Sequence, residues 1–115
     1  VADAVARGLV VLPGALTPSE VLAAWRAGAT AVKLFPVSSL GPGHVRALRA
    51  VLPPALPLLA VGGIGPANLA DYLHAGCLGA GLGGELYRPG QAPAVTAANA
   101  AAFVAAYRAC RADGA

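Results

Sequence analysis

The chain has 115 residues, of which 57% are apolar and 11% are charged, and its formal net charge is +3. This composition supports one folded domain with a buried core and excludes a disordered tail. The seven arginines are scattered and aromatic residues are few, so we expect no nucleic-acid partner. No run of about 18 apolar residues is free of glycine, proline or polar groups, and the N-terminus lacks a signal-peptide pattern. We therefore expect a cytoplasmic protein without membrane contact.

Prolines mark an internal repeat along the chain. Pro18, Pro42 and Pro66 recur every 24 residues (42 − 18 and 66 − 42), and each opens an apolar helical pattern. Apolar runs precede these patterns, so we expect short strands to alternate with helices. In chain order, we predict a helical tail at 1–7, strands at 9–12, 31–35, 58–61 and 79–82, and helices at 18–27, 42–51, 66–76 and 94–112.

The first proline-led helix has recognisable signals at both ends. Thr17 precedes Pro18, and Glu20 follows three residues after the threonine, which predicts a capping box with proline at the first helical position. Gly28 stands just after the last helical turn, where a left-handed glycine commonly ends a helix. The segment 9–12 is apolar throughout, and we expect it to be a buried strand.

Continuously apolar strands that alternate with helices predict an α/β fold with a parallel sheet covered by helices. Two architectures fit this order: a small open sheet, or part of a (β/α)8 barrel. A complete barrel needs about 200 residues or more, so one domain over residues 1–115 would supply about four βα units. If the fold is a barrel, we expect these residues to form its C-terminal half.

Lys33 is the only lysine, and it lies in the middle of the apolar segment 31–35. A buried ammonium costs several kcal/mol unless it is paired or loses its proton. Desolvation lowers the pKa of a lysine, and a neutral amine can attack a ketone to form a Schiff base. The alternatives are a strand-end lysine that reaches solvent and a lysine paired with a carboxylate. The isolation of Lys33 favours the catalytic interpretation.

Two glycine-rich turns follow neighbouring predicted strands, at 62–65 and 81–84. In a barrel, the loops after the last strands and a nearby helix N-terminus present backbone N–H groups that hold phosphate. Glycine also occurs at such corners because it adopts positive φ angles. One turn alone favours that conformational explanation, whereas the pair favours a phosphate site.

The remaining polar residues give weaker signals. His44 and His74 fall inside helical patterns, and Cys77 and Cys110 lack metal-binding spacing, so we predict no metal site. Both cysteines are expected in the core. Glu85 is the only acidic residue beside a predicted glycine turn, and no residue stands out as a general base.

Several motifs stand in a specific order along nearly the whole chain. They are Leu12 to Glu20 (Leu-Pro-Gly-Ala-Leu-Thr-Pro-Ser-Glu), Val32-Lys33-Leu34-Phe35-Pro36, Val61-Gly62-Gly63-Ile64 with Asn68-Leu69, and Gly79 to Gly83. Together they resemble the 2-keto-3-deoxy-6-phosphogluconate/4-hydroxy-2-oxoglutarate aldolase family. The Leu-Tyr-Arg-Pro-Gly-Gln segment at 86–91 is similar to the galactonate branch of that family, as is Val61, where gluconate-type members usually carry threonine.

The resemblance implies a class I aldolase on a (β/α)8 barrel that forms a homotrimer and needs no metal or other cofactor. Lys33 matches the Schiff-base lysine. The galactonate branch would cleave 2-dehydro-3-deoxy-6-phosphogalactonate, a phosphorylated keto-sugar acid, into pyruvate and glyceraldehyde 3-phosphate; a gluconate-type or 4-hydroxy-2-oxoglutarate aldolase is the alternative. Positions matching the substrate and phosphate pocket are Val61, Gly62, Gly63, Gly83 and Gly84, and those matching its wall are Phe35, Pro13 and Gly14.

Two departures from the family pattern affect these expectations. The family's general-base glutamate lies on an early strand that is not among these residues. Relatives usually carry serine where Gly84 stands, so one hydroxyl contact to the substrate is absent. The alternative from another functional class is a non-catalytic, phosphate-binding half barrel, which would expose strand edges and apolar surface until a partner covered them.

Overall fold

Four short parallel strands form one sheet in the computed structural model of this chain, which describes residues 1–114. The strands are β1 (Gly14–Ala15), β2 (Val32–Leu34), β3 (Leu58–Val61) and β4 (Gly79–Gly81), and they lie side by side in that order. The helices are α1 (Ala2–Ala6), α2 (Pro18–Arg26), α3 (Gly41–Arg49), α4 (Leu69–Ala75) and α5 (Pro93–Asp113). Each strand is followed by a helix, so the predicted α/β fold with four βα units is confirmed.

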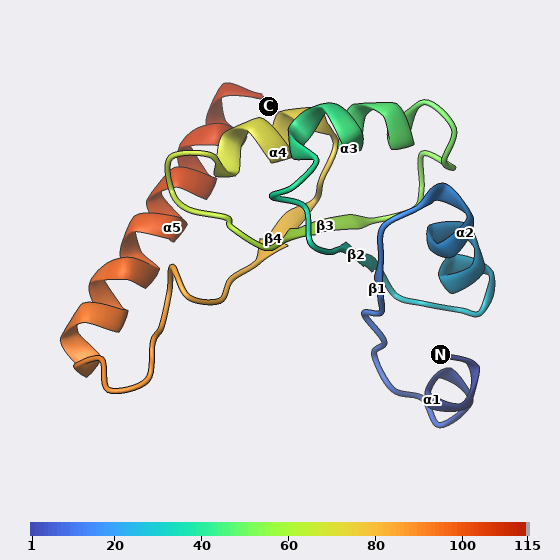
Figure 1. Cartoon of the computed structure of the whole chain (residues 1–115), viewed down its shortest axis with the longest axis horizontal. Helices are drawn as coiled ribbons and strands as arrows, with labels where there is room; N and C mark the ends of the chain where they lie inside the picture. Colours follow the sequence, from blue (N-terminus) through green and yellow to red (C-terminus); the bar gives the residue numbers. More distant parts are fainter. Residues whose placement is uncertain (115) are drawn as a thin grey trace.

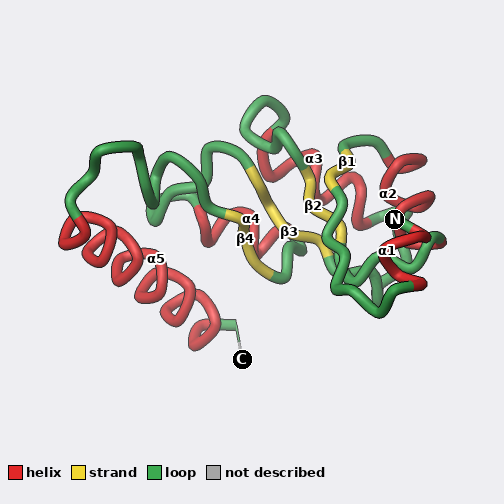
Figure 2. Tube along the Cα trace, turned by 90° about the horizontal axis from the view of Figure 1, so that it is seen from below, coloured by secondary structure: helices red, strands yellow, loops and turns green. Residues whose placement is uncertain are grey.

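The helices cover one face of the sheet. In Figure 1, α3 and α4 lie above the strands, and no helix of the described chain crosses the opposite face of β2, β3 and β4, which Figure 2 shows from below. Successive side chains of a strand point to opposite faces, and the alternate residues Val32, Leu34, Leu58 and Ala60 are completely buried. The helices add Val21, Val45, Leu48, Leu69, Tyr72 and Phe103 to the same core.

The helix-free face carries a different row of residues. Lys33 of β2 pairs with Leu59 of β3 on one side and with Gly14 of β1 on the other. Lys33 and Leu59 are half-buried, in contrast to their fully buried strand neighbours. Residues two apart on a strand share a face, so Phe35 and Val61 extend this row toward the carboxyl ends of the strands.

The predicted signals at both ends of α2 are confirmed. The Thr17 hydroxyl accepts a hydrogen bond from the Glu20 amide at 3.3 Å, and a Glu20 carboxylate oxygen accepts one from the Thr17 amide at 2.8 Å. Pro18 is the first helical residue. Gly28 follows the helix with a φ of +94°, and a Cβ added there would lie 2.9 Å from a methyl carbon of Val5. Glycine at this position therefore lets the first helical segment pack against the end of α2.

The predicted buried strand at 9–12 is wrong. Val10 is 75% exposed, and the first strand begins after this segment, at Gly14. Val11 still takes part in pairing, because its carbonyl accepts a hydrogen bond from the Thr30 amide at 2.9 Å. β1 lies at the edge of the sheet and has β2 as its single neighbour in the described chain, so little covers the apolar side chains before it.

The remaining elements differ from their predicted bounds by a few residues. The helix predicted from Pro66 begins at Leu69, because residues 66–68 form a turn in which Asn68 Oδ1 accepts a hydrogen bond from the Gly65 amide at 2.9 Å. Within residues 1–114, no helix is both long enough and apolar enough to cross a membrane. Cys77 and Cys110 are buried and free of disulfides, as predicted for core residues.

Candidate active site

Lys33 occupies the helix-free face of the central part of the sheet. Its two strand neighbours, Val32 and Leu34, are completely buried on the other face, whereas the lysine is half-buried rather than enclosed. The only salt bridge among residues 1–114 joins Arg7 to Asp3, and the Lys33 amine has no hydrogen-bond partner in that part of the chain. The ion-paired alternative is therefore wrong for the described residues.

Pro13 and Gly14 lie beside Lys33 on the edge strand. The Lys33 amide donates a hydrogen bond to the Pro13 carbonyl at 2.9 Å, and Gly14 is the residue paired with Lys33. A Cβ added to Gly14 would meet no atom within 4 Å. The sequence therefore places open space, rather than a side chain, next to the lysine on this face.

A pocket of about 280 Å³ lies at the carboxyl ends of β2, β3 and β4. It brings together six predicted site residues: Phe35, Val61, Gly62, Gly63, Gly83 and Gly84. Three other predicted site residues, Lys33, Pro13 and Gly14, do not line it. Pro13 precedes β1, and Gly14 and Lys33 lie on β1 and β2 before the strand ends that form the pocket. Two residues of a β strand span about 6–7 Å, so Lys33 lies about that distance along β2 before Phe35.

Close backbone approach explains the glycines of the first turn. Gly62 has a φ of +103°, and a Cβ there would lie 3.4 Å from the Phe35 ring. Gly63 has a φ of +68°, and its Cβ would lie 2.9 Å from the Cβ of Ser38. Both the conformation and the space therefore favour glycine, which supports the conformational explanation for this turn without excluding a ligand role.

The side chain of Asn68 holds this turn closed. Asn68 Oδ1 accepts a hydrogen bond from the Gly65 amide at 2.9 Å, and Asn68 Nδ2 donates one to the Gly63 carbonyl at 3.0 Å. These contacts leave the amides of Gly62 and Gly63 without an acceptor in the described chain. Unpaired N–H groups that border a pocket are suited to bind an anion.

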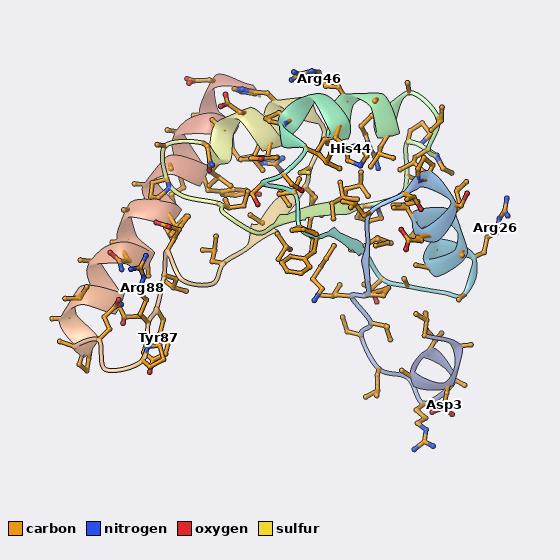
Figure 3. All side chains as sticks on the ribbon, viewed as in Figure 1. Asp3, Arg26, His44, Arg46, Tyr87 and Arg88 are labelled. Carbon is orange, nitrogen blue, oxygen red and sulfur yellow. The ribbon has the colours of Figure 1, made fainter. Side chains whose placement is uncertain are left out.

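The second turn is fixed by the segment that leads into α5. The Tyr87 amide donates to the Gly83 carbonyl at 3.1 Å, and Arg88 Nε donates to the Gly84 carbonyl at 3.1 Å. Figure 3 shows both side chains in the segment next to the first turns of α5. The amides of Gly83 and Gly84, like those of the first turn, have no acceptor within residues 1–114.

Neither Gly83 nor Gly84 of the second turn is required by conformation. Gly83 and Gly84 have no positive φ, and a Cβ on Gly83 would meet nothing within 4 Å. The conformational explanation therefore applies to Gly62 and Gly63 and fails for Gly83 and Gly84. The turn at Gly83 is the stronger indication of a ligand-binding backbone.

The pocket also includes other residues of the two predicted glycine turns, namely Ile64, Gly81 and Leu82. Glu85, predicted beside the second turn, supplies the only carboxylate among the described lining residues. A Cβ on Gly81 would lie 2.9 Å from Val61 Cγ2, so this glycine makes room for the neighbouring strand.

The other polar candidates lie away from this pocket. His44 of α3 binds the carbonyl of Leu16 through Nε2 at 2.9 Å, which connects α3 to the loop before α2. No group of three or more His, Cys, Asp or Glu side chains within residues 1–114 is arranged to hold a metal ion. His44 therefore has a structural contact rather than a place in the site.

A model of the KDPG and KHG aldolase family matches residues 1–102. The chain belongs to this family. It is 53% identical over 105 residues to 2-dehydro-3-deoxy-6-phosphogalactonate aldolase of Escherichia coli (strain K12), a match that covers 91% of this chain and 51% of that protein. It is 47% identical over 104 residues to a probable 2-dehydro-3-deoxy-6-phosphogalactonate aldolase of Rhizobium meliloti (strain 1021), covering 90% of this chain and 49% of the relative.

A solved structure described as native KDPGal superposes with a TM-score of 0.93 and 51% sequence identity. The superposition covers 95% of this chain and 53% of that chain. The chain thus spans about half the length of the curated relatives it matches. Its four βα units correspond to half of the (β/α)8 barrel of this family, as predicted.

Proposed function

We propose that this chain provides the Schiff-base part of a class I aldolase site that cleaves 2-dehydro-3-deoxy-6-phosphogalactonate. The observation that carries the proposal is the position of Lys33. Its amine is unpaired on the helix-free face of the sheet, and a pocket bordered by four glycine amides without acceptors follows along the same strands. An amine and an anion site at this spacing are suited to a substrate with a ketone near one end and a phosphate at the other.

In the proposed reaction, the Lys33 amine attacks the C2 ketone of the substrate and water is lost. The protonated imine then accepts the electron pair of the C3–C4 bond as that bond breaks and the C4 hydroxyl gives its proton to a general base. Glyceraldehyde 3-phosphate leaves, the remaining enamine takes a proton at C3, and hydrolysis of the imine releases pyruvate. The iminium is the electron acceptor, so the steps assigned to Lys33 need no metal or other cofactor.

The glycine turns would bind the phosphate. Amides of Gly62, Gly63, Gly83 and Gly84 border the pocket and lack acceptors, and each hydrogen bond from an N–H group to a charged oxygen contributes more than a neutral one. Phe35 and Val61 would form the apolar wall over the carbon chain. Gly84 offers no hydroxyl, so the phosphate contact at that position would come from the backbone alone.

The single lysine makes the central experiment decisive. The chain would be incubated with pyruvate, reduced with borohydride and mapped by peptide mass spectrometry. We expect a reduced pyruvate adduct on the peptide that contains Lys33 and none after Lys33→Gln substitution. Any polypeptide used in this experiment also has an N-terminal amine, so an adduct confined to its N-terminal peptide would contradict the proposed role of Lys33.

The choice of substrate is a separate part of the proposal. The names of the two relatives favour the galactonate epimer over 2-keto-3-deoxy-6-phosphogluconate or 4-hydroxy-2-oxoglutarate. The test compares cleavage of the two C4 epimers by the complete barrel, and faster cleavage of the gluconate epimer would reverse the assignment. Phosphate binding without any imine would instead favour the non-catalytic half barrel.

A homotrimer and a cytoplasmic location complete the proposal. Membership of the family supports both, and the two free cysteines are typical of a reducing compartment. Light scattering of the complete barrel would measure its native mass. We expect the mass of three subunits, and a monomeric mass would contradict the proposed assembly.

A further inference from the structure

A second cavity, of about 430 Å³, lies between α4 and α5 and shares no lining residue with the pocket at the strand ends. Figure 1 shows the C-terminal part of α5 beside α4, on the helix side of the sheet. The cavity is lined by Leu73, His74, Cys77, Cys110, Arg111 and Gly114. It therefore contains two thiols, one imidazole and one guanidinium, none of which has a role in the proposed aldolase site.

Cys110 and His74 form a direct contact in this cavity. Cys110 Sγ lies 3.4 Å from His74 Nε2, within hydrogen-bond distance for a sulfur atom. His74 belongs to the last turn of α4. A thiolate, rather than a thiol, is the nucleophile in disulfide exchange. The imidazole can therefore accept the thiol proton and leave a reactive sulfur.

The other groups around the pair favour Cys110 over Cys77. Burial raises the pKa of the Cys77 thiol to about 11, so this thiol is almost entirely protonated at neutral pH. Arg111 lines the same cavity, and Arg49 of α3 joins Cys77 and Arg111 in lining the adjacent one. No carboxylate is among the described lining residues, so the charged groups facing the cavity are positive.

We propose that Cys110 is a covalent modification site for small anionic disulfides, with His74 as the positioning residue that accepts its proton. In this step the Cys110 thiol gives its proton to His74 Nε2, and the sulfur attacks one sulfur of the disulfide. A new sulfur–sulfur bond forms on Cys110, and the other half leaves as a thiolate. The positive charge of Arg111 would attract an anionic reagent of this class. This inference does not depend on the proposed aldolase activity.

The experiment treats the chain with oxidised glutathione at neutral pH and follows the increase in intact mass, with peptide mapping of the modified cysteine. We expect Cys110 to react about 10-fold faster than Cys77, because His74 lies within reach of the Cys110 proton whereas the raised pKa of the Cys77 thiol keeps its thiolate fraction small. The Cys77→Ser variant should keep the fast reaction and Cys110→Ser should lose it. Modification that survives Cys110→Ser at the original rate would overturn the proposal.

Two further variants test the neighbouring groups. We expect His74→Gln to slow modification of Cys110 and to remove a step from its pH profile, an effect that a purely structural role would not produce.

We expect Arg111→Gln to slow the reaction with oxidised glutathione while the reaction with cystamine, a cationic disulfide, is not slowed. Thermal unfolding and labelling in denaturant control for misfolding. Unchanged rates in folded His74→Gln would remove the role of the histidine and the proposal with it.

Discussion

Gly63 lies against Ser38, so a Cβ on the glycine would be 2.9 Å from the Cβ of the serine. Ser38 belongs to the loop after β2 and Gly63 to the turn after β3. Real Cβ atoms do not approach so closely, and the φ of Gly63, +68°, is a conformation that other residues rarely adopt. The missing side chain therefore allows two loops of the candidate site to pack together.

We expect Gly63→Ala to lower the free energy of unfolding by at least about 1–2 kcal/mol, the cost of a left-handed conformation for a residue with a Cβ. Contact with Ser38 adds to that cost. Gly65→Ala is the matched control in the same turn, because Gly65 has no positive φ and no atom within 4 Å of its added Cβ. Urea denaturation of both variants measures the difference. Equal stability of the two variants would contradict the observed packing.

Gly83 allows a cleaner test of the phosphate site than Gly63 does. It has neither a positive φ nor an atom within 4 Å of its added Cβ, so a larger side chain fits the fold. We expect Gly83→Val to weaken binding of inorganic phosphate at least about 10-fold, because the side chain blocks the approach of an anion to the turn amides. Pyruvate imine formation at Lys33 should be unchanged. Calorimetric titration and borohydride trapping measure the two ligands.

The control for Gly83→Val is Gly43→Ala, in helix α3, which also has open space around its added Cβ. It should leave both phosphate binding and imine formation unchanged. A similar loss of both ligands in Gly83→Val would indicate a folding defect and remove the support for phosphate binding at this turn.

Local signals in the sequence were sufficient to predict most of the fold. Thr17, Pro18 and Glu20 form their capping box through contacts within four residues, so their pattern contains the complete physical cause. The strand at 9–12 failed because burial is not local. The apolar residues at 9–12 have the pattern of a core strand. They lead into β1 at the edge of the sheet, however, and a local pattern does not show whether other elements cover such an edge.

The candidate site was predicted unevenly for a related reason. Lys33 is conspicuous as a lone cation among apolar residues, but the sequence could not show that it would be half-buried on a helix-free face. The roles of the glycines were also inseparable in the sequence. Only the φ angle of Gly63 and its contact with Ser38 distinguish this glycine, which the conformation requires, from Gly83, which has neither constraint.

Acidification should weaken the cap of α2. Hydrogen bonds from Thr17, chiefly from its backbone amide and then from its hydroxyl, and from the Leu16 amide hold the pKa of Glu20 below its ordinary value of 4.5. A carboxylate with a lowered pKa in the folded state stabilises the fold above the unfolded-state pKa. That contribution is lost as the pH falls through the lowered folded-state value.

We therefore expect the thermal stability of the chain to decrease more between pH 7 and pH 3 than that of Glu20→Gln, whose side chain has no such titration. Glu85→Gln is the control, since Glu85 has no capping hydrogen bond among the contacts of residues 1–114. Its acid dependence should match that of the unaltered chain. An equal decrease for Glu20→Gln and the unaltered chain would contradict the role of this cap in acid sensitivity.

Imine formation and aldol cleavage should separate in this chain. Lys33 has an unpaired amine, but cleavage also needs a base for the C4 hydroxyl proton. Among the described carboxylates, Asp3 pairs with Arg7 and Glu20 caps α2. Asp71 lies in α4, and Asp113 is the last residue of α5. Only Glu85 lines the candidate pocket. The described residues thus supply the nucleophile without a base beside it.

A positioned general base typically contributes about 10²–10⁴-fold to the rate. We therefore expect the 115-residue chain to form the pyruvate imine yet to cleave 2-dehydro-3-deoxy-6-phosphogalactonate at least about 10²-fold more slowly than the full-length E. coli relative. Lys33→Gln gives the background rate, and addition of the remaining half of the barrel as a second polypeptide should restore part of the activity. Turnover equal to that of the full-length relative would contradict the expectation. In that case a further loss in Glu85→Gln would identify Glu85 as the base, because it is the only described carboxylate that lines the pocket.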